Sequence, residues 1–141
     1  MHIDQPEAKF RGDPASRRVL ALAALLLALA TACGAFGAHA LKSQLPPERL
    51  QVWDTAVRYQ FFQALGLLGA GLLLRTADSR VLRFATALIV AGTILFCGGV
   101  YALALGAPPI VGSAPPVAGP LMIAGWLVFA WGAWRSRPLA S

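Results

Sequence analysis

Charged side chains are scarce in this sequence, since Asp, Glu, Lys and Arg make up only 13% of its 141 residues. In soluble domains these four residue types usually supply about a quarter of the chain. Hydrophobic residues account for 57%. This composition excludes an ordinary soluble domain and indicates that lipid is the main solvent. The net charge of +6 does not indicate a nucleic-acid partner, because the sequence contains no basic face with interleaved aromatic residues.

Residues typical of metal and catalytic sites are also few. The two histidines and two cysteines do not have the spacing of a metal-ligand set. The sequence contains no Walker loop, dinucleotide-binding glycine fingerprint or HExxH motif, and no set of Ser, His and Asp that resembles a triad. We therefore expect no metal, no cofactor and no enzymatic activity.

Four long stretches with few or no charges predict four membrane crossings. A transmembrane helix needs about 20 apolar residues to cross the roughly 30 Å hydrocarbon core. The second stretch reaches that length only if Arg58 and Arg75 at its ends extend toward the lipid headgroups. We predict an all-α membrane protein, a bundle of four transmembrane helices with spans at residues 19–41, 57–75, 84–105 and 117–134.

The segments outside these spans are more polar. The predicted organisation is a mobile cytoplasmic tail at 1–16, a transmembrane domain at 17–137 and a C-terminal tail at 138–141. The stretch 106–120 is dense in Gly and Pro, which favours an outer loop.

The segment between the first two spans combines apolar residues at helical spacing with charged residues. Leu50, Trp53 and Val57 recur three and four residues apart, and Pro46 and Pro47 precede them. This pattern predicts an amphipathic helix that lies in the outer interface before the second span begins. A solvated linker is the alternative.

Basic residues are distributed unevenly over the two predicted sides. Nine lie on the side of the termini, namely Lys9, Arg11, Arg17, Arg18, Arg75, Arg80, Arg83, Arg135 and Arg137. Three lie on the other side, namely Lys42, Arg49 and Arg58. Cytoplasmic segments carry an excess of Lys and Arg. We therefore predict a multi-pass protein of the bacterial cytoplasmic (inner) membrane with both termini in the cytoplasm.

Small residues near the end of the first span indicate close helix packing. Ala30, Gly34 and Ala38 are four residues apart, and Gly37 lies beside them. Such spacing lets helix backbones approach each other in lipid. The stretch "ATAC" that ends at Cys33 also resembles a lipoprotein cleavage box, in which this cysteine would become a lipidated N-terminus. We favour a retained helix, because the apolar run continues past the cysteine.

Several motifs are similar to one family of small bacterial membrane proteins. They are "GAFGAHALK", "WDTAVRYQ", "ALGLL", "GVYALALG" and "GPLMIAGW". Together they resemble the domain-of-unknown-function 423 family (YgdD/YwdK-like proteins) over residues 20–134. The resemblance implies a four-helix integral membrane protein of unassigned biochemical function. Two positions depart from the usual family pattern, since Gln63 stands where His is common and Cys97 where Ser is common.

Polar residues gather at or just inside the predicted outer face, and they form the candidate site: His39, Lys42, Asp54, Arg58, Gln60 and Gln63. A histidine near such charges could sense pH or bind an anionic headgroup. The alternative is that His39 only hydrogen-bonds a neighbouring helix or the interface. Cys33 and Cys97 lie at similar depths in two spans of the same direction, so they are either two buried thiols or a bridged pair.

Two functional interpretations follow from the sequence. The first is a non-enzymatic packing or assembly component that contacts the lipid bilayer, other membrane proteins or a second copy of itself. The alternative is a small transporter or channel component, although transport pathways are usually marked by charges or broken helices within the spans. The middles of the predicted spans contain no acidic or basic residue, which favours the first interpretation.

Overall fold

The computed structural model describes residues 14–77 and 79–136, and all regular structure in these residues is helical. Four long helices follow one another: α1 (Pro14–His39), α2 (Pro47–Leu73), α3 (Arg80–Ala104) and α4 (Ala114–Arg135). Two of the three connections between these helices contain a short 3₁₀ turn, namely η2 (Leu41–Ser43) before α2 and η3 (Pro109–Ser113) before α4. The predicted four-helix fold is confirmed. Residues 14–16, predicted as the end of the N-terminal tail, belong to α1, whereas 1–13 and 137–141 lie outside the described residues.

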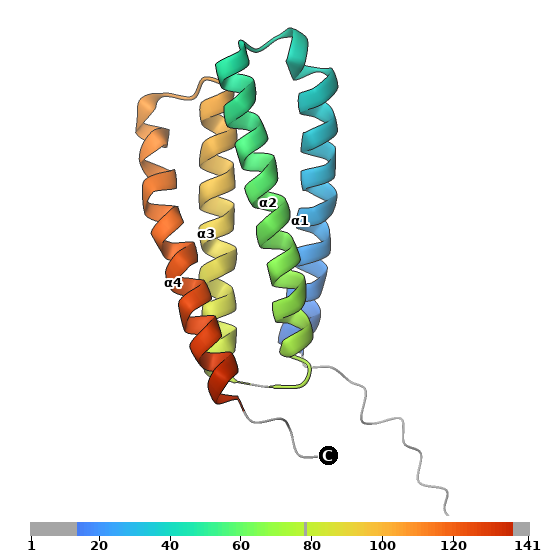
Figure 1. Cartoon of the computed structure of the whole chain (residues 1–141), viewed down its shortest axis with the longest axis vertical. Coiled ribbons are helices and arrows are strands. Elements are labelled where there is room, and N and C mark those ends of the chain that lie inside the picture. Colours follow the sequence, from blue (N-terminus) through green and yellow to red (C-terminus); the bar gives the residue numbers. More distant parts are fainter. Residues whose placement is uncertain (1–13, 78, 137–141) are drawn as a thin grey trace, which may run out of the picture.

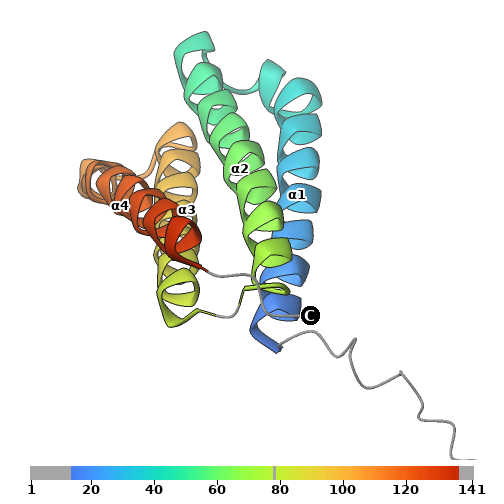
Figure 2. The same ribbon diagram turned by 60° about the horizontal axis from the view of Figure 1, so that its bottom comes forward.

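Consecutive helices are antiparallel and lie side by side (Figure 1). The extensive contacts join α1 to α2, α2 to α3, and α3 to α4. The first residues of α1, the α2–α3 connection and the last residues of α4 therefore lie at the same end of the bundle, as a second view also shows (Figure 2).

Three helical segments of the described residues are long and apolar enough to cross a membrane: Pro14–Ser43, Arg80–Ala104 and Ile110–Arg135. α2 is not among them, and its first half carries the charged residues Glu48, Arg49, Asp54 and Arg58. Length and apolarity thus support three of the predicted crossings directly, and the crossing by α2 depends on its packing against α1.

A seam of small residues on α1 packs against α2. Ser16, Ala23, Ala30 and Gly37 are seven residues apart, and all four are buried. Seven residues are nearly two turns of an α-helix, so this spacing keeps one face turned toward a partner. Larger side chains recur at the same spacing on α2, where Trp53, Gln60 and Leu67 are buried, and Leu74 directly after the helix is buried too.

α3 and α4 form a second seam with the same spacing. Ala118, Gly125 and Gly132 are seven residues apart on α4 and buried. On α3, Gly92 faces Met122, and Ile89 faces Gly125. The absence of side chains at the two glycines lets the helix backbones approach closely.

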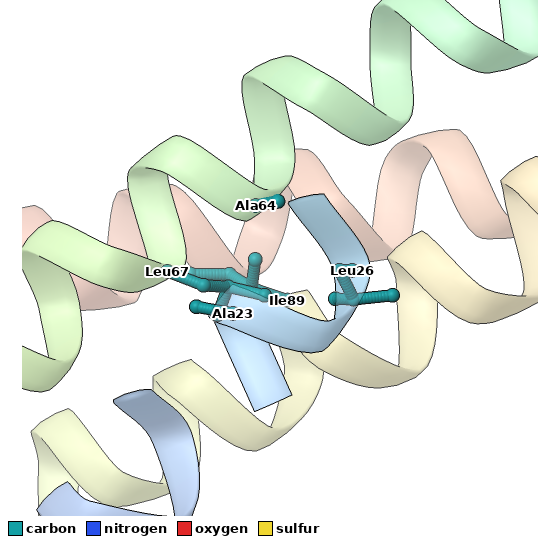
Figure 3. Packing of buried hydrophobic residues seen from close by; sticks show 5 residues of the cluster. All are labelled: Ala23, Leu26, Ala64, Leu67 and Ile89. Carbon is teal, nitrogen blue, oxygen red and sulfur yellow. The ribbon is translucent and has the colours of Figure 1, made fainter. Parts of the chain in front are cut away.

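The two helix pairs meet in one apolar cluster near the middle of the bundle. Ala23 and Leu26 of α1, Ala64 and Leu67 of α2 and Ile89 of α3 are buried together (Figure 3). Trp126 and Phe129 of α4 pack against this cluster. All four helices therefore share one core.

The predicted interfacial helix between the first two spans is wrong, because those residues form the first half of one continuous helix. The predicted stripe of Leu50, Trp53 and Val57 continues through Gln60, Ala64 and Leu67 of α2 without a break. Its Trp53 is only 5% exposed, so this face contacts protein and not the membrane interface.

The predicted outer loop at 106–120 is also shorter than expected. α4 begins at Ala114, so Pro115, Pro116 and Pro120 are helical. Proline is tolerated in the first turn of a helix because the N–H groups there have no intrahelical partner. Pro120 lies further in, where its missing N–H removes one backbone hydrogen bond.

Candidate functional site: the junction of α1, α2 and α3

Trp53 of α2 joins three helices near the η2 turn. Its indole Nε1 donates a hydrogen bond of 2.9 Å to the carbonyl oxygen of Cys33 on α1. Its ring centroid lies 4.5 Å from that of Tyr101 on α3 and 6.0 Å from that of Phe36 on α1. The indole fits because Gly37 has no side chain, and a Cβ there would lie 2.7 Å from Nε1. Gly37 is therefore required by the tryptophan that packs on it.

Gln60 makes a second connection one level deeper in the bundle. Its Nε2 donates to the carbonyl oxygen of Leu26 on α1 at 2.9 Å, and its Oε1 accepts from the Tyr101 hydroxyl on α3 at 2.9 Å. The side chain is 5% exposed. The amide thus uses both of its polar ends to link α1, α2 and α3. We call Cys33, Gly37, Trp53, Gln60 and Tyr101 the helix junction.

Gln63, three residues after Gln60, contacts α4. Its Oε1 accepts a hydrogen bond of 2.8 Å from Nε1 of Trp126 on α4. The indole of Trp126 also covers Gly66, where a Cβ would lie 2.5 Å from the ring. Gln63 and Gly66 are one turn apart, so this single tryptophan ties α4 to α2.

The predicted outer-face cluster is therefore divided. Gln60 and Gln63 connect helices inside the bundle. His39 at the end of α1, Lys42 in η2, and Asp54 and Arg58 of α2 are exposed. Asp54 and Arg58 line a surface groove of about 380 Å³ on one side of α2. The structure does not bring these four charged or titratable residues together with the two glutamines.

The predicted packing residues of α1 differ in how deeply they are buried. Ala30 and Gly37 are buried, and Gly34 is half-buried with ordinary contact to Val57. Ala38 is exposed and does not belong to this buried face of the bundle. Steps of four residues turn the face by about 40° each time, whereas a step of seven turns it back by only about 20°. The true seam therefore follows the seven-residue spacing.

The polar side chains of the helix junction are engaged in hydrogen bonds. Cys33 and Cys97 are free thiols, and Cys97 is buried. Within residues 14–77 and 79–136, no three His, Cys, Asp or Glu side chains are grouped closely enough to hold a metal ion. The polar atoms of Trp53, Gln60 and Tyr101 are used to connect helices. The junction is thus built to hold the bundle together.

The sequence motifs had indicated the residues of the junction but not their connections. "GAFGAHALK" contains Gly37, on which Trp53 of "WDTAVRYQ" packs. The motif "WDTAVRYQ" also contains Gln60, which accepts a hydrogen bond from Tyr101 of "GVYALALG". The signal that sequence reasoning missed is the shared seven-residue spacing of Ala30 and Gly37 with Trp53 and Gln60.

Four long helices, three of them apolar enough to cross a membrane, share one core and bond their buried polar groups internally, which defines an all-helical integral membrane protein. The family profile described as "Protein of unknown function (DUF423)" matches residues 33–119, and the chain belongs to this family. The resemblance predicted from the motifs is confirmed.

Curated relatives have the same character. A UPF0382 membrane protein of Staphylococcus saprophyticus is 38% identical over 114 residues, covering 81% of this chain and 94% of that protein. The UPF0382 membrane protein YwdK of Bacillus subtilis is 39% identical over 111 residues, covering 76% and 88%. A UPF0382 membrane protein of Haemophilus influenzae is 34% identical over 122 residues, covering 86% and 98%. No solved structure matches the chain.

Proposed function

We propose that this protein is a non-enzymatic component of the bacterial cytoplasmic membrane that acts by binding lipid or other membrane proteins. One observation carries the proposal: each buried polar side chain of the described residues has a hydrogen-bond partner within the chain. The four are Ser16, Gln60, Thr86 and Thr93. A transport pathway or a catalytic site needs polar groups that can bind a solute or substrate, and these are already engaged.

The outward-facing surface supports the same proposal. Large apolar side chains cover the outer sides of the helices, and the most exposed ones on α4 are Val117, Ile123, Leu127 and Trp134. Such a surface is suited to lipid chains or to the apolar helices of a partner. Function then resides on the outside of the bundle, while the inside maintains its shape.

The orientation proposed has both termini in the cytoplasm. At one end of the described bundle lie six arginines, namely Arg17, Arg18, Arg75, Arg80, Arg83 and Arg135, and we call it the arginine-rich end. The opposite end carries Lys42 and Arg49, and Arg58 lies further along α2. The excess of Lys and Arg on cytoplasmic segments favours placing the arginine-rich end inside.

The packing of α2 supports a fourth crossing. At one end Trp53 binds Cys33, and at the other the Ser16 hydroxyl donates a 2.8 Å hydrogen bond to the Gly71 carbonyl. Eighteen residues separate Trp53 from Gly71, which at 1.5 Å per residue is about 27 Å, close to the thickness of the hydrocarbon core. α2 therefore accompanies α1 over nearly the full depth of the membrane.

The same contacts favour a first helix that is retained after synthesis. Ser16, Ala23, Leu26 and Ala30 precede Cys33 and supply much of the α1 face that packs on α2. Cleavage before Cys33 would remove this face and leave the carbonyl partner of Gln60 missing. A lipoprotein form is thus inconsistent with a stable bundle.

Crosslinking through photo-leucine in native membranes tests the proposed function. This amino acid is close to leucine in shape, so its incorporation preserves the packing. We expect intermolecular adducts with one lipid species or one protein partner at Leu127, which is 67% exposed, and only internal adducts at Leu67, which is 0% exposed. The buried leucine thus serves as a control within the same molecule.

A different pattern would contradict the proposal. Purified protein whose thermal stability rises with one small solute, and whose exposed leucines label only bulk lipid, would support the small transporter or channel component instead.

A further inference from the structure

The side of α2 that no other helix covers carries two opposite charges one turn apart. α2 lies between α1 and α3 (Figure 1), and it packs against both of them. Its remaining side is exposed over the whole length of the helix. We call this side the open face of α2, and its residues include Gln51, Asp54, Arg58, Leu65 and Gly69. The first three of them line the surface groove of about 380 Å³ described above.

The two charges lie at a depth where α1 has only uncharged residues. Trp53 and Gln60, which flank the charges along α2, donate hydrogen bonds to the carbonyl oxygens of Cys33 and Leu26 on α1. Both α1 residues lie inside the predicted span 19–41, which contains no Asp, Glu, Lys or Arg. Charged side chains at such a depth are costly in lipid, and they usually pair with one another or face protein. The first half of the open face is therefore poorly suited to acyl chains.

Neither charge is neutralised within residues 14–77 and 79–136. Asp54 and Arg58 are exposed, and neither side chain makes an ion pair or a hydrogen bond with another residue of these two ranges. Their spacing of four residues would permit an ion pair along the helix, but the two side chains do not form one. Both charges are thus available to another molecule.

A second copy of the chain presents the complementary charges at the matching depth. Copies inserted in the same orientation hold α2 at the same level, and a two-fold axis along the membrane normal brings the same face of each copy together. Side chains on a helix lean toward its N-terminus, so the Arg58 guanidinium reaches back toward the level of residue 54. Two equivalent ion pairs can then form, each between Arg58 of one copy and Asp54 of the other. A lipid headgroup is less suitable, because it lies in the interface outside the hydrocarbon core.

We infer that the protein forms a homodimer in the membrane through the open face of α2, with Arg58 of each copy paired to Asp54 of the other. The inference rests on the crossing of α2 proposed above, and it names one protein partner and the surface that binds it. Gly69 lies further along the same face, with no atom within 4 Å of its ideal Cβ, so a partner helix can approach closely there.

Charge reversal in the full chain tests the inference. Fluorescently tagged protein is placed in liposomes of phosphatidylethanolamine and phosphatidylglycerol, and subunits are counted by single-molecule photobleaching over a range of protein densities. The parent should be dimeric. Asp54→Lys places two like-charged pairs in the interface, and so does Arg58→Glu, so each variant alone should dimerise at least about tenfold more weakly. Mixed in equal amounts and labelled in two colours, the variants should form dimers of one with the other, because both pairs are then attractive.

Matched controls separate the open face from the rest of the surface. Glu48→Lys and Lys42→Glu make the same changes of charge at exposed positions outside this face, and both should dimerise like the parent. Gly69→Leu should weaken the dimer by steric hindrance. Gly98→Leu adds the same side chain on the exposed side of α3, again with no atom within 4 Å of the ideal Cβ, and should leave the dimer unchanged.

Three results would overturn the inference. The first is a parent that stays monomeric at every density, which needs no variant and so does not depend on variant folding. The second is a mixture of the two charge-reversed variants that stays monomeric although each melts like the parent. The third is a dimer that Gly98→Leu disrupts and Gly69→Leu does not, since the interface would then lie on α3. The adducts expected at Leu127 of α4 test the proposed function separately, and the sidedness of the connections on either side of α2 tests its crossing.

Discussion

The Gly125→Leu variant is expected to lose the folded bundle. A Cβ at Gly125 would lie 2.8 Å from Cγ1 of Ile89, 3.1 Å from the Ile89 backbone nitrogen and 3.3 Å from the Ala85 carbonyl oxygen. Backbone atoms cannot move aside as a flexible side chain can, so a leucine there must separate α3 from α4. Overpacking of a tight core commonly costs about 1–3 kcal/mol, and we expect this site to lie at or above the upper value.

The same helix offers a matched control. Gly119 has no atom within 4 Å of its ideal Cβ, so Gly119→Leu adds the same side chain in open space. Leucine favours helix more than glycine by roughly 0.5–1 kcal/mol, so the control should be as stable as the parent or slightly more so. The measurement is the midpoint of thermal unfolding in bicelles. Equal midpoints for the two variants would show that α3 and α4 do not approach closely at Gly125.

The Gln60→Leu variant is expected to loosen the joint between α1, α2 and α3. Leucine has a similar volume to glutamine but can neither donate to the Leu26 carbonyl nor accept from Tyr101. Interhelical hydrogen bonds in membranes contribute about 0.6–2 kcal/mol each. Loss of both should lower the free energy of unfolding by about 2 kcal/mol.

Tyr101→Phe removes only one of these bonds and should cost about half as much. Because both substitutions break the same Gln60–Tyr101 bond, the double variant should cost less than the sum of the two single variants. Tyr59→Phe is the control, since Tyr59 is exposed and its ring contact with Phe96 does not need the hydroxyl. Strict additivity of the two costs would contradict a direct bond between Gln60 and Tyr101.

The sequence alone was sufficient to predict the four helices. Runs without charge depend only on local composition, so they located α1 and α3 to within a few residues. The boundaries of α2 and α4 were harder to predict. Charged residues between Glu48 and Arg58 suggested a separate element, and Pro115, Pro116 and Pro120 suggested a loop, but both segments are helical.

The pairing of the helices could not be predicted from composition. A pattern with four-residue steps pointed to Ala30, Gly34 and Ala38, whereas the seam follows Ala30 and Gly37. The four-residue pattern and the observed seam both include Ala30. Which of the two faces is buried depends on where the partner helix lies, and the spacing alone does not show this. Trp53 illustrates the same limit, because an aromatic residue near a predicted interface has the same sequence context whether it faces headgroups or a neighbouring helix.

The polar candidate residues differ in how deeply they are buried in the bundle. His39 is the last residue of α1 and Lys42 lies in η2, and both are exposed, whereas Gln60 is held among three helices. A list of polar residues in sequence order contains no information on which of them finds a partner in space. In lipid, burial decides the role of a polar residue, because a buried amide needs a hydrogen-bond partner.

The most direct test of this account is the sidedness of three connections. Reporter fusions after Ser43, Ser79 and Ser113 mark the connections that precede α2, α3 and α4. If α2 crosses the membrane with α1 and the arginine-rich end is cytoplasmic, the reporters lie outside, inside and outside, respectively. If α2 does not cross, the reporters after Ser43 and Ser79 lie on the same side, and that result would contradict the four-crossing bundle.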